Sequence, residues 1–170
     1  MPEDRLRAIF EGSEKPKSGR AYLVRGRYSA LCYFIEEIRH GHCGMVITRQ
    51  DPKQIKRLFN PETVKVWWLS ELGTENSIKP NLQKLSLFIS QYLENPPCPE
   101  PVVLLDGAEY LVASFGFKPV LQLLQTLHDR FIAANGVLLV PINVEVLKPE
   151  ERAFLEAEFP ALKEKSICKI

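Results

Sequence analysis

The stretch PVVLLDGAEYLV, residues 101–112, decides the fold, because it is an unbroken apolar run that ends on a carboxylate and then turns at a glycine. A run of this kind is typical of a strand buried on both faces of a parallel sheet. The carboxyl ends of parallel strands in an open α/β sheet face the ligand crevice. Asp106 is therefore the first candidate for a functional residue.

Four other short apolar runs alternate with helical patterns along the chain. The expected strands cover residues 21–25, 44–48, 64–69 and 137–140. The segments between them carry apolar residues at helical spacing, and each parallel crossover needs such a connection. The sequence thus predicts a three-layer α/β domain, with a mainly parallel five-stranded sheet and helices on both faces.

Residues 1–19 differ in composition from the rest of the chain. Leu6, Ile9 and Phe10 fall at helical spacing, and residues 12–19 are rich in glycine, serine and charge, as in a linker. We therefore expect an N-terminal helix and linker over residues 1–19. The remaining residues, 20–170, have the length of a single α/β domain.

Charge and hydropathy exclude several classes of function. The chain has 22 Lys and Arg against 21 Asp and Glu, a formal net charge of +1, so nucleic acid is not an expected partner. No segment approaches the roughly 20 apolar residues of a membrane span. The amino terminus lacks the apolar centre of a secretory signal. We expect no membrane insertion and a cytoplasmic location.

The four cysteines show no C-x-x-C spacing, and a chain of this length can bury a core without disulfides. They are Cys32, Cys43, Cys98 and Cys168. We expect all four to be reduced and structural. His40 and His42 lie beside Cys43, but three crowded ligands without a fourth make a poor tetrahedral site, so no metal is expected.

Residues 25–29 (RGRYS) follow the first expected strand, where a phosphate-binding version of this architecture carries its loop. That loop needs several glycines, a lysine and a following hydroxyl. Here there is one glycine and no Gly-Lys pair, so ATP with magnesium is disfavoured as a cofactor. Either the turn is a solvated basic turn, or it receives a single anion at the helix start. In that second case the ligand-binding candidates are Arg25, Gly26, Arg27, Ser29 and Arg49.

Asp106 and Glu109 form an Asp-x-x-Glu arrangement that has two interpretations. It suits metal-bound water or general-base chemistry, which makes both residues catalytic candidates. It is also the pattern of a helix cap, in which the aspartate accepts from a first-turn amide and the glutamate reaches back. The sequence favours the cap without excluding the site.

Several segments carry a resemblance to a known family: residues 21–24 (AYLV), 46–49 (VITR), 66–69 (VWWL), 102–111 (VVLLDGAEYL) and 137–142 (VLLVPI). Over about residues 20–158 the chain resembles an archaeal family of unknown function. Members of that family often occur beside sensory or membrane modules, which implies a role in signalling or assembly.

At a greater distance the layout is similar to the RecA and KaiC class of P-loop ATPases. The resemblance would put the Asp106 strand in the place of that class's magnesium-binding strand. The chain departs from the class at residues 25–29, where the Walker A loop is missing. The resemblance therefore implies a degenerate RecA-like scaffold.

The leading hypothesis is a non-catalytic regulatory or protein-interaction module of a signalling or assembly system. It implies a protein partner, and the helix of Leu6, Ile9 and Phe10 offers a route to a homodimer. The alternative is an atypical nucleotide- or anion-binding protein or enzyme that uses Asp106 and Glu109 with Arg25 and Arg27.

Overall fold

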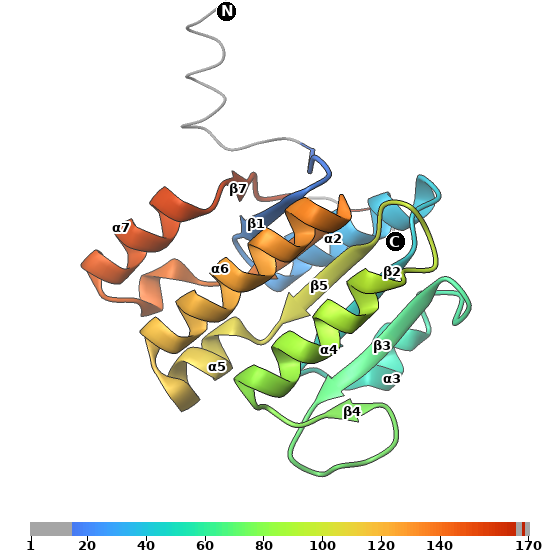
Figure 1. Cartoon of the computed structure of the whole chain (residues 1–170), viewed down its shortest axis with the longest axis horizontal. Helices are drawn as coiled ribbons and strands as arrows, with labels where there is room; N and C mark the ends of the chain where they lie inside the picture. Colours follow the sequence, from blue (N-terminus) through green and yellow to red (C-terminus); the bar gives the residue numbers. More distant parts are fainter. Residues whose placement is uncertain (1–14, 166–167, 169–170) are drawn as a thin grey trace, which may run out of the picture.

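The computed structural model describes residues 15–165 and residue 168. The N-terminal helix expected around Leu6, Ile9 and Phe10 lies outside the described residues. The described part forms one parallel sheet with helices on both sides (Figure 1). The strands are β1 Arg20–Val24, β2 Gly44–Thr48, β3 Val64–Leu69, β4 Ser77–Ile78, β5 Val102–Asp106, β6 Val137–Pro141 and β7 Ala161–Leu162.

The parallel sheet is confirmed, but it has seven strands and not five. Their order is β4-β3-β2-β5-β6-β1-β7, and every pairing is parallel. The two unexpected strands, β4 and β7, lie at the edges and contain two residues each. A pair of residues is too short to show an apolar alternation, so the sequence carries no signal for them.

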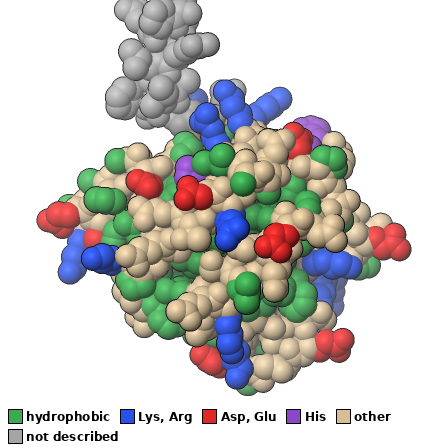
Figure 2. Space-filling model, viewed as in Figure 1, with side chains coloured by type: hydrophobic (Ala, Val, Ile, Leu, Met, Phe, Trp, Pro, Cys, Tyr) green, Lys and Arg blue, Asp and Glu red, His purple; other side chains and the backbone are tan. Residues whose placement is uncertain are grey.

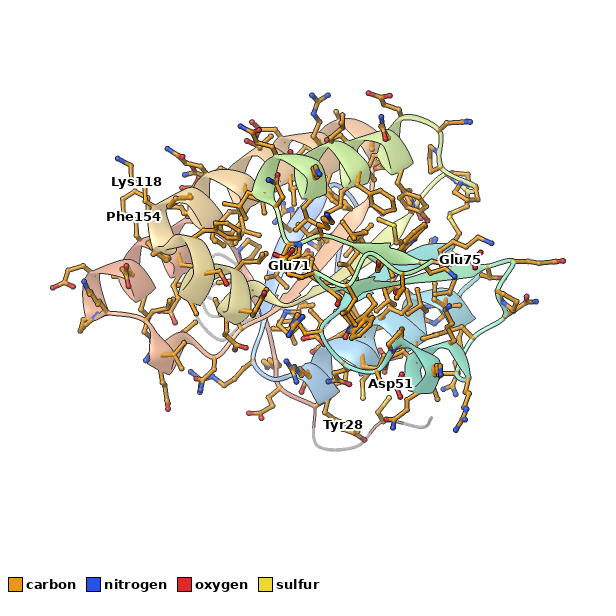
Figure 3. All side chains as sticks on the ribbon, turned by 90° about the horizontal axis from the view of Figure 1, so that it is seen from below. Tyr28, Asp51, Glu71, Glu75, Lys118 and Phe154 are labelled. Carbon is orange, nitrogen blue, oxygen red and sulfur yellow. A yellow bond between two sulfur atoms is a disulfide. The ribbon has the colours of Figure 1, made fainter. Side chains whose placement is uncertain are left out.

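Helices cover both faces, as expected, and the sheet is seen nearly edge-on between them in Figure 3. The helices are α2 Arg27–Arg39, α3 Pro52–Lys56, α4 Leu82–Glu94, α5 Ala108–Phe115, α6 Phe117–Ala134 and α7 Pro149–Glu158, with a 3-10 turn at Val144–Val146. Two core clusters result. One joins the sheet to α4, α5, α6 and α7, and the other joins it to α2 and α3.

The central strands feed both clusters because successive side chains of a strand point to opposite faces. In β5, Leu105 belongs to the cluster under α4 and α6, whereas Leu104 packs toward α2. Figure 2 shows the outer surface of the α4 and α6 side, where hydrophobic side chains lie in patches between charged ones. No helix in the described part of the chain has the length and apolar character needed to cross a bilayer.

The topology places Asp106 where the sequence put it, at the carboxyl end of a buried strand. β1 and β5 run in the same direction in one sheet, with β6 between them. In the pairing of β2 with β5, Thr48 lies opposite Asp106. The carboxyl ends of β1, β2 and β5 therefore lie along the same end of the sheet. We call this end, at which the strands stop, the carboxyl edge.

The opposite end of the sheet holds a disulfide, which corrects the expectation that all four cysteines are reduced. Cys43 immediately precedes β2, and Cys98 lies in the proline-rich loop between α4 and β5; the two are joined across a sequence separation of 55. Cys32 and Cys168 are free thiols. The pairing depends on β2 and β5 being neighbours, which spacing alone does not reveal. Cys43 is consequently not a thiolate ligand beside His42.

We expect loss of this disulfide to destabilise the fold. Cross-linking a loop of this length removes denatured-state entropy worth roughly 2–4 kcal/mol. Cys98→Ser should therefore lower Tm by about 5–15 °C in a calorimetric scan. Cys168→Ser, which leaves the disulfide intact, is the control. Equal melting temperatures for the two variants under oxidising conditions would contradict the assignment.

Candidate functional site

The site is built around the carboxylate of Asp106, a residue that is 7% exposed as a whole. Its Oδ2 accepts a hydrogen bond from the Thr48 hydroxyl at 2.9 Å, and its Oδ1 accepts one from Nε of Arg27 at 3.0 Å. The Thr48 hydroxyl in turn accepts from the backbone N–H of Gln50 at 2.9 Å. Since that amide occupies an acceptor position, it orients the hydroxyl proton toward Asp106.

Arg27 reaches Asp106 because of the turn that precedes it. It is the first residue of α2, and the N-cap before it is Gly26, whose φ of 92° lies in the region that favours glycine. From there the guanidinium spans the end of β6 to reach the end of β5. Its side chain remains 51% exposed, while that of Asp106 is 10% exposed. The ion pair thus has a solvent-facing cation and a buried anion.

Little space remains beside this ion pair. The cavity there has a volume of about 20 Å³ and is lined by Arg27, Leu31, Val46, Thr48, Gln50, Ile55, Leu104, Asp106 and Pro141. A space of that size holds about one water molecule, whereas ligand sites usually measure about 300–1,000 Å³. Side chains therefore fill the crevice between the turn at residues 25–29 and Asp106.

Burial dominates the electrostatics of Asp106. Desolvation raises the pKa of its carboxyl group, and the positive charge of Arg27 and the hydrogen bond from Thr48 oppose that rise. A buried carboxylate without these two partners would hold its proton more tightly still. Arg27 and Thr48 therefore together lower the free-energy cost of burying the ionised Asp106 carboxylate at the carboxyl edge.

The side chains of Arg49 and Ser29 have partners other than the Asp106 carboxylate. Arg49 donates from Nη1 to the carbonyl oxygen of Leu69 at 2.7 Å, and its guanidinium lies 4.2 Å from the centre of the Tyr110 ring. Ser29 is buried, and its hydroxyl accepts from the backbone N–H of Lys165 at 2.8 Å. Arg25 is exposed at the end of β1. Of the predicted anion contacts, Arg27 is the one whose side chain bonds the Asp106 carboxylate; the backbone N–H of Arg49 donates to the backbone carbonyl oxygen of Asp106 at 3.1 Å.

The favoured helix-cap interpretation of Asp106 and Glu109 is wrong. α5 begins at Ala108 after the N-cap Gly107, and no side chain of the described residues caps it. The carboxylate of Asp106 instead accepts hydrogen bonds from Thr48 of β2 and Arg27 of α2. Glu109 accepts from the backbone N–H of Asn143, which fastens the loop after β6 to α5. The two carboxylates therefore have separate partners.

Sequence reasoning missed Thr48 as a member of the site. Part of the signal was available, because Thr48 ends one of the expected strands and its hydroxyl can donate to a carboxylate. The pairing of β2 with β5 was needed to bring the two residues into register.

Comparison with known proteins agrees with this architecture. The family model described as "Protein of unknown function (DUF835)" matches residues 27–159. The chain is also similar to a KaiC-like protein of the hyperthermophilic archaeon Pyrococcus horikoshii OT3, with 13% identity, a TM-score of 0.54, and coverage of 90% of this chain and 76% of that one. No curated protein matches the sequence. At this identity the likeness shows the fold, which is RecA-like.

We expect Arg27→Ala to destabilise the protein in a pH-dependent way. Folding raises the pKa of Asp106. Ionisation of this carboxyl group therefore lowers the unfolding free energy as the pH rises from the usual pKa of an aspartate toward the raised pKa in the folded protein. Arg27 offsets that cost only while Asp106 is charged. The variant should lose roughly 1–2 kcal/mol of unfolding free energy at pH 7.5 and less at pH 4, measured by urea denaturation.

Arg25→Ala is the matched control, because it removes an equal charge two residues away at an exposed position. It should change the unfolding free energy by less than about 0.5 kcal/mol at either pH. If both variants lose the same stability, or if the loss in Arg27→Ala does not depend on pH, the ion pair does not stabilise the carboxyl edge.

Proposed function

This chain belongs to the DUF835 family of proteins of unknown function, and we propose that it is a non-catalytic regulatory or protein-interaction module of a signalling or assembly system. The observation that carries the proposal is the internal ion pair between Arg27 and Asp106. It occupies the crevice that a RecA-like scaffold offers to a ligand. The scaffold is kept, and its small-molecule position is filled by the chain itself.

The ion pair opposes both halves of a magnesium nucleotide. A cation approaching Asp106 meets a guanidinium already 3.0 Å from the carboxylate. A phosphate approaching Arg27 meets a buried carboxylate, which repels it. The turn at residues 25–29 has one glycine, so it lacks the run of free amides that would cradle phosphates. Ligand binding here would require breaking the pair.

Because side chains fill the crevice, the remaining candidate for binding a partner is the outer surface of the domain. A groove between α4 and α6, which we call the α4–α6 groove, has a volume of about 540 Å³. Leu87 at this groove is 59% exposed. Apolar grooves between helices are a recurring docking place for a partner helix. This surface supports a protein partner for the module.

One observation favours the alternative of atypical anion binding. Arg25 lies beside a second cavity of about 300 Å³ at the carboxyl ends of β1 and β7, which Lys163 also lines. Glu156 and Glu164 line the same cavity and repel an anion, and Asp106 is not part of its lining. We therefore rank this function below the interaction module.

The test is a titration of the full chain with ATP, cyclic nucleotides and magnesium by calorimetry, with thermal shift in parallel. We expect no binding at millimolar ligand, hence a Tm shift under about 1 °C. Arg27→Ala is titrated alongside, since binding gained only in that variant would show that the ion pair blocks the crevice in the wild type. Tight magnesium-dependent ATP binding by the wild type, with turnover lost in Asp106→Ala, would remove the proposal.

A further inference from the structure

The segment that follows β7 packs along one side of α2. The Tyr33 hydroxyl donates to the carbonyl oxygen of Lys163 at 2.6 Å, and the backbone N–H of Lys165 donates to the Ser29 hydroxyl at 2.8 Å. The Lys165 ammonium forms an ion pair with Glu36 and lies 4.4 Å from the centre of the Tyr33 ring. Because residues three and four apart on a helix are neighbours, all these partners share one side of α2. We call the described residues 163–165 and 168 the C-terminal strap.

Two thiols meet where the C-terminal strap reaches the first turns of α2. The backbone N–H of Cys168 donates to the hydroxyl of Tyr28 at 2.9 Å. Cys32 follows Tyr28 by one helical turn, so it lies on the same side of α2. The Cys32 thiol is hydrogen-bonded to the Tyr28 hydroxyl and to the Cys168 thiol. Both cysteines are free thiols, so the fold brings two reduced sulfurs into contact from distant parts of the sequence.

The two thiols differ in their access to solvent. Cys32 is 0% exposed, and its burial raises the pKa of its thiol to about 12. Cys168 is partly exposed. Thiol–disulfide exchange needs a thiolate and an open approach to the sulfur. An external disulfide therefore reaches Cys168 first, and Cys32 reacts only with a sulfur that already lies beside it.

We propose that Cys32 and Cys168 form a redox modification site, which a low-molecular-weight disulfide such as oxidised glutathione converts into an intramolecular disulfide that locks the C-terminal strap onto α2. The Cys168 thiolate attacks one sulfur of the external disulfide, which forms a mixed disulfide and releases the first small thiolate. Cys32 gives up its proton, attacks the Cys168 sulfur and expels the second small thiolate. The protons of the two protein thiols end on the two released small thiols. The protein is thereby oxidised by two electrons, and the external disulfide is reduced.

Once formed, this disulfide resists reduction by external thiols. The Cys32 sulfur is enclosed, so a reductant attacks the Cys168 sulfur and has to expel Cys32. A thiol with a raised pKa is a poor leaving group. The locked helix is the one that begins with Arg27 of the ion pair. The inference goes beyond the proposed function, because it concerns a covalent state of the domain that needs no partner protein.

The test incubates the full chain with oxidised glutathione and then blocks the remaining thiols with N-ethylmaleimide in denaturant. Tryptic peptides are mapped by mass spectrometry without reduction. We expect a disulfide-linked pair of peptides, residues 28–39 and 166–169, besides the disulfide of Cys43 with Cys98. The intact chain should lose two hydrogen atoms and should no longer carry N-ethylmaleimide on either thiol of the site.

Two variants separate the two steps of the reaction. In Cys32→Ala the mixed disulfide of Cys168 with glutathione should accumulate, because the second attacking thiol is missing. In Cys168→Ser the buried Cys32 should stay a free thiol. The melting scans that compare Cys98→Ser with Cys168→Ser are run before glutathione disulfide is added, when both thiols of the site are free.

A third variant, Glu36→Gln, tests whether the C-terminal strap positions the two sulfurs. It removes the ion pair with Lys165, so formation of the intramolecular disulfide should slow about two- to fivefold, with more mixed disulfide on Cys168. Glu37→Gln is the matched control. It removes the same charge from the next position of α2, where the carboxylate lies 3.6 Å from His42, and it should leave the rate unchanged.

Three products would overturn the proposal. They are a wild-type chain that stops at the mixed disulfide, dimers joined through Cys168 as the main species, and a Cys32 that still reacts with N-ethylmaleimide after oxidation. Equal rates in Glu36→Gln and Glu37→Gln would also contradict it, because the C-terminal strap would then not bring the two thiols together.

Discussion

The structure depends on one ion pair at the carboxyl edge of a parallel sheet. Arg27 is the first residue of α2 and Asp106 is the last residue of β5. Their side chains form an ion pair across the end of β6. The buried anion requires a neighbouring cation, because a charge without a partner is costly away from water. The half-exposed guanidinium meets that requirement without being buried itself. The pair therefore stabilises the edge and fills it at the same time.

The sequence was sufficient for the architecture wherever the signal is local. The apolar run ending at Asp106 predicts both a buried strand and the edge at which the carboxylate lies, and both are confirmed. The sequence did not predict the strands β4 and β7, because each has only two residues and so shows no periodicity. The disulfide of Cys43 with Cys98 escaped for a different reason: its partners become neighbours only through the order of the strands.

The site shows where residue type stops being informative. Arg27, Arg49 and Ser29 were all predicted as anion contacts from their places at one edge. The structure gives Arg49 a carbonyl and an aromatic ring, and Ser29 a backbone amide of the C-terminal segment. Only Arg27 turns toward Asp106. A basic residue near a carboxylate can serve a ligand or the fold, and the direction of the side chain decides between them.

Both ends of the sheet are braced, which limits where this scaffold can respond to other molecules. At the amino end, the disulfide joins Cys98 to Cys43, and Glu100 accepts from Ser18 and lies 3.5 Å from His42. At the carboxyl end the Arg27 ion pair leaves space for about one water. A crevice that must break such contacts to open is a poor receptor. The proposed function therefore assigns partner binding to the α4–α6 groove on the helical face.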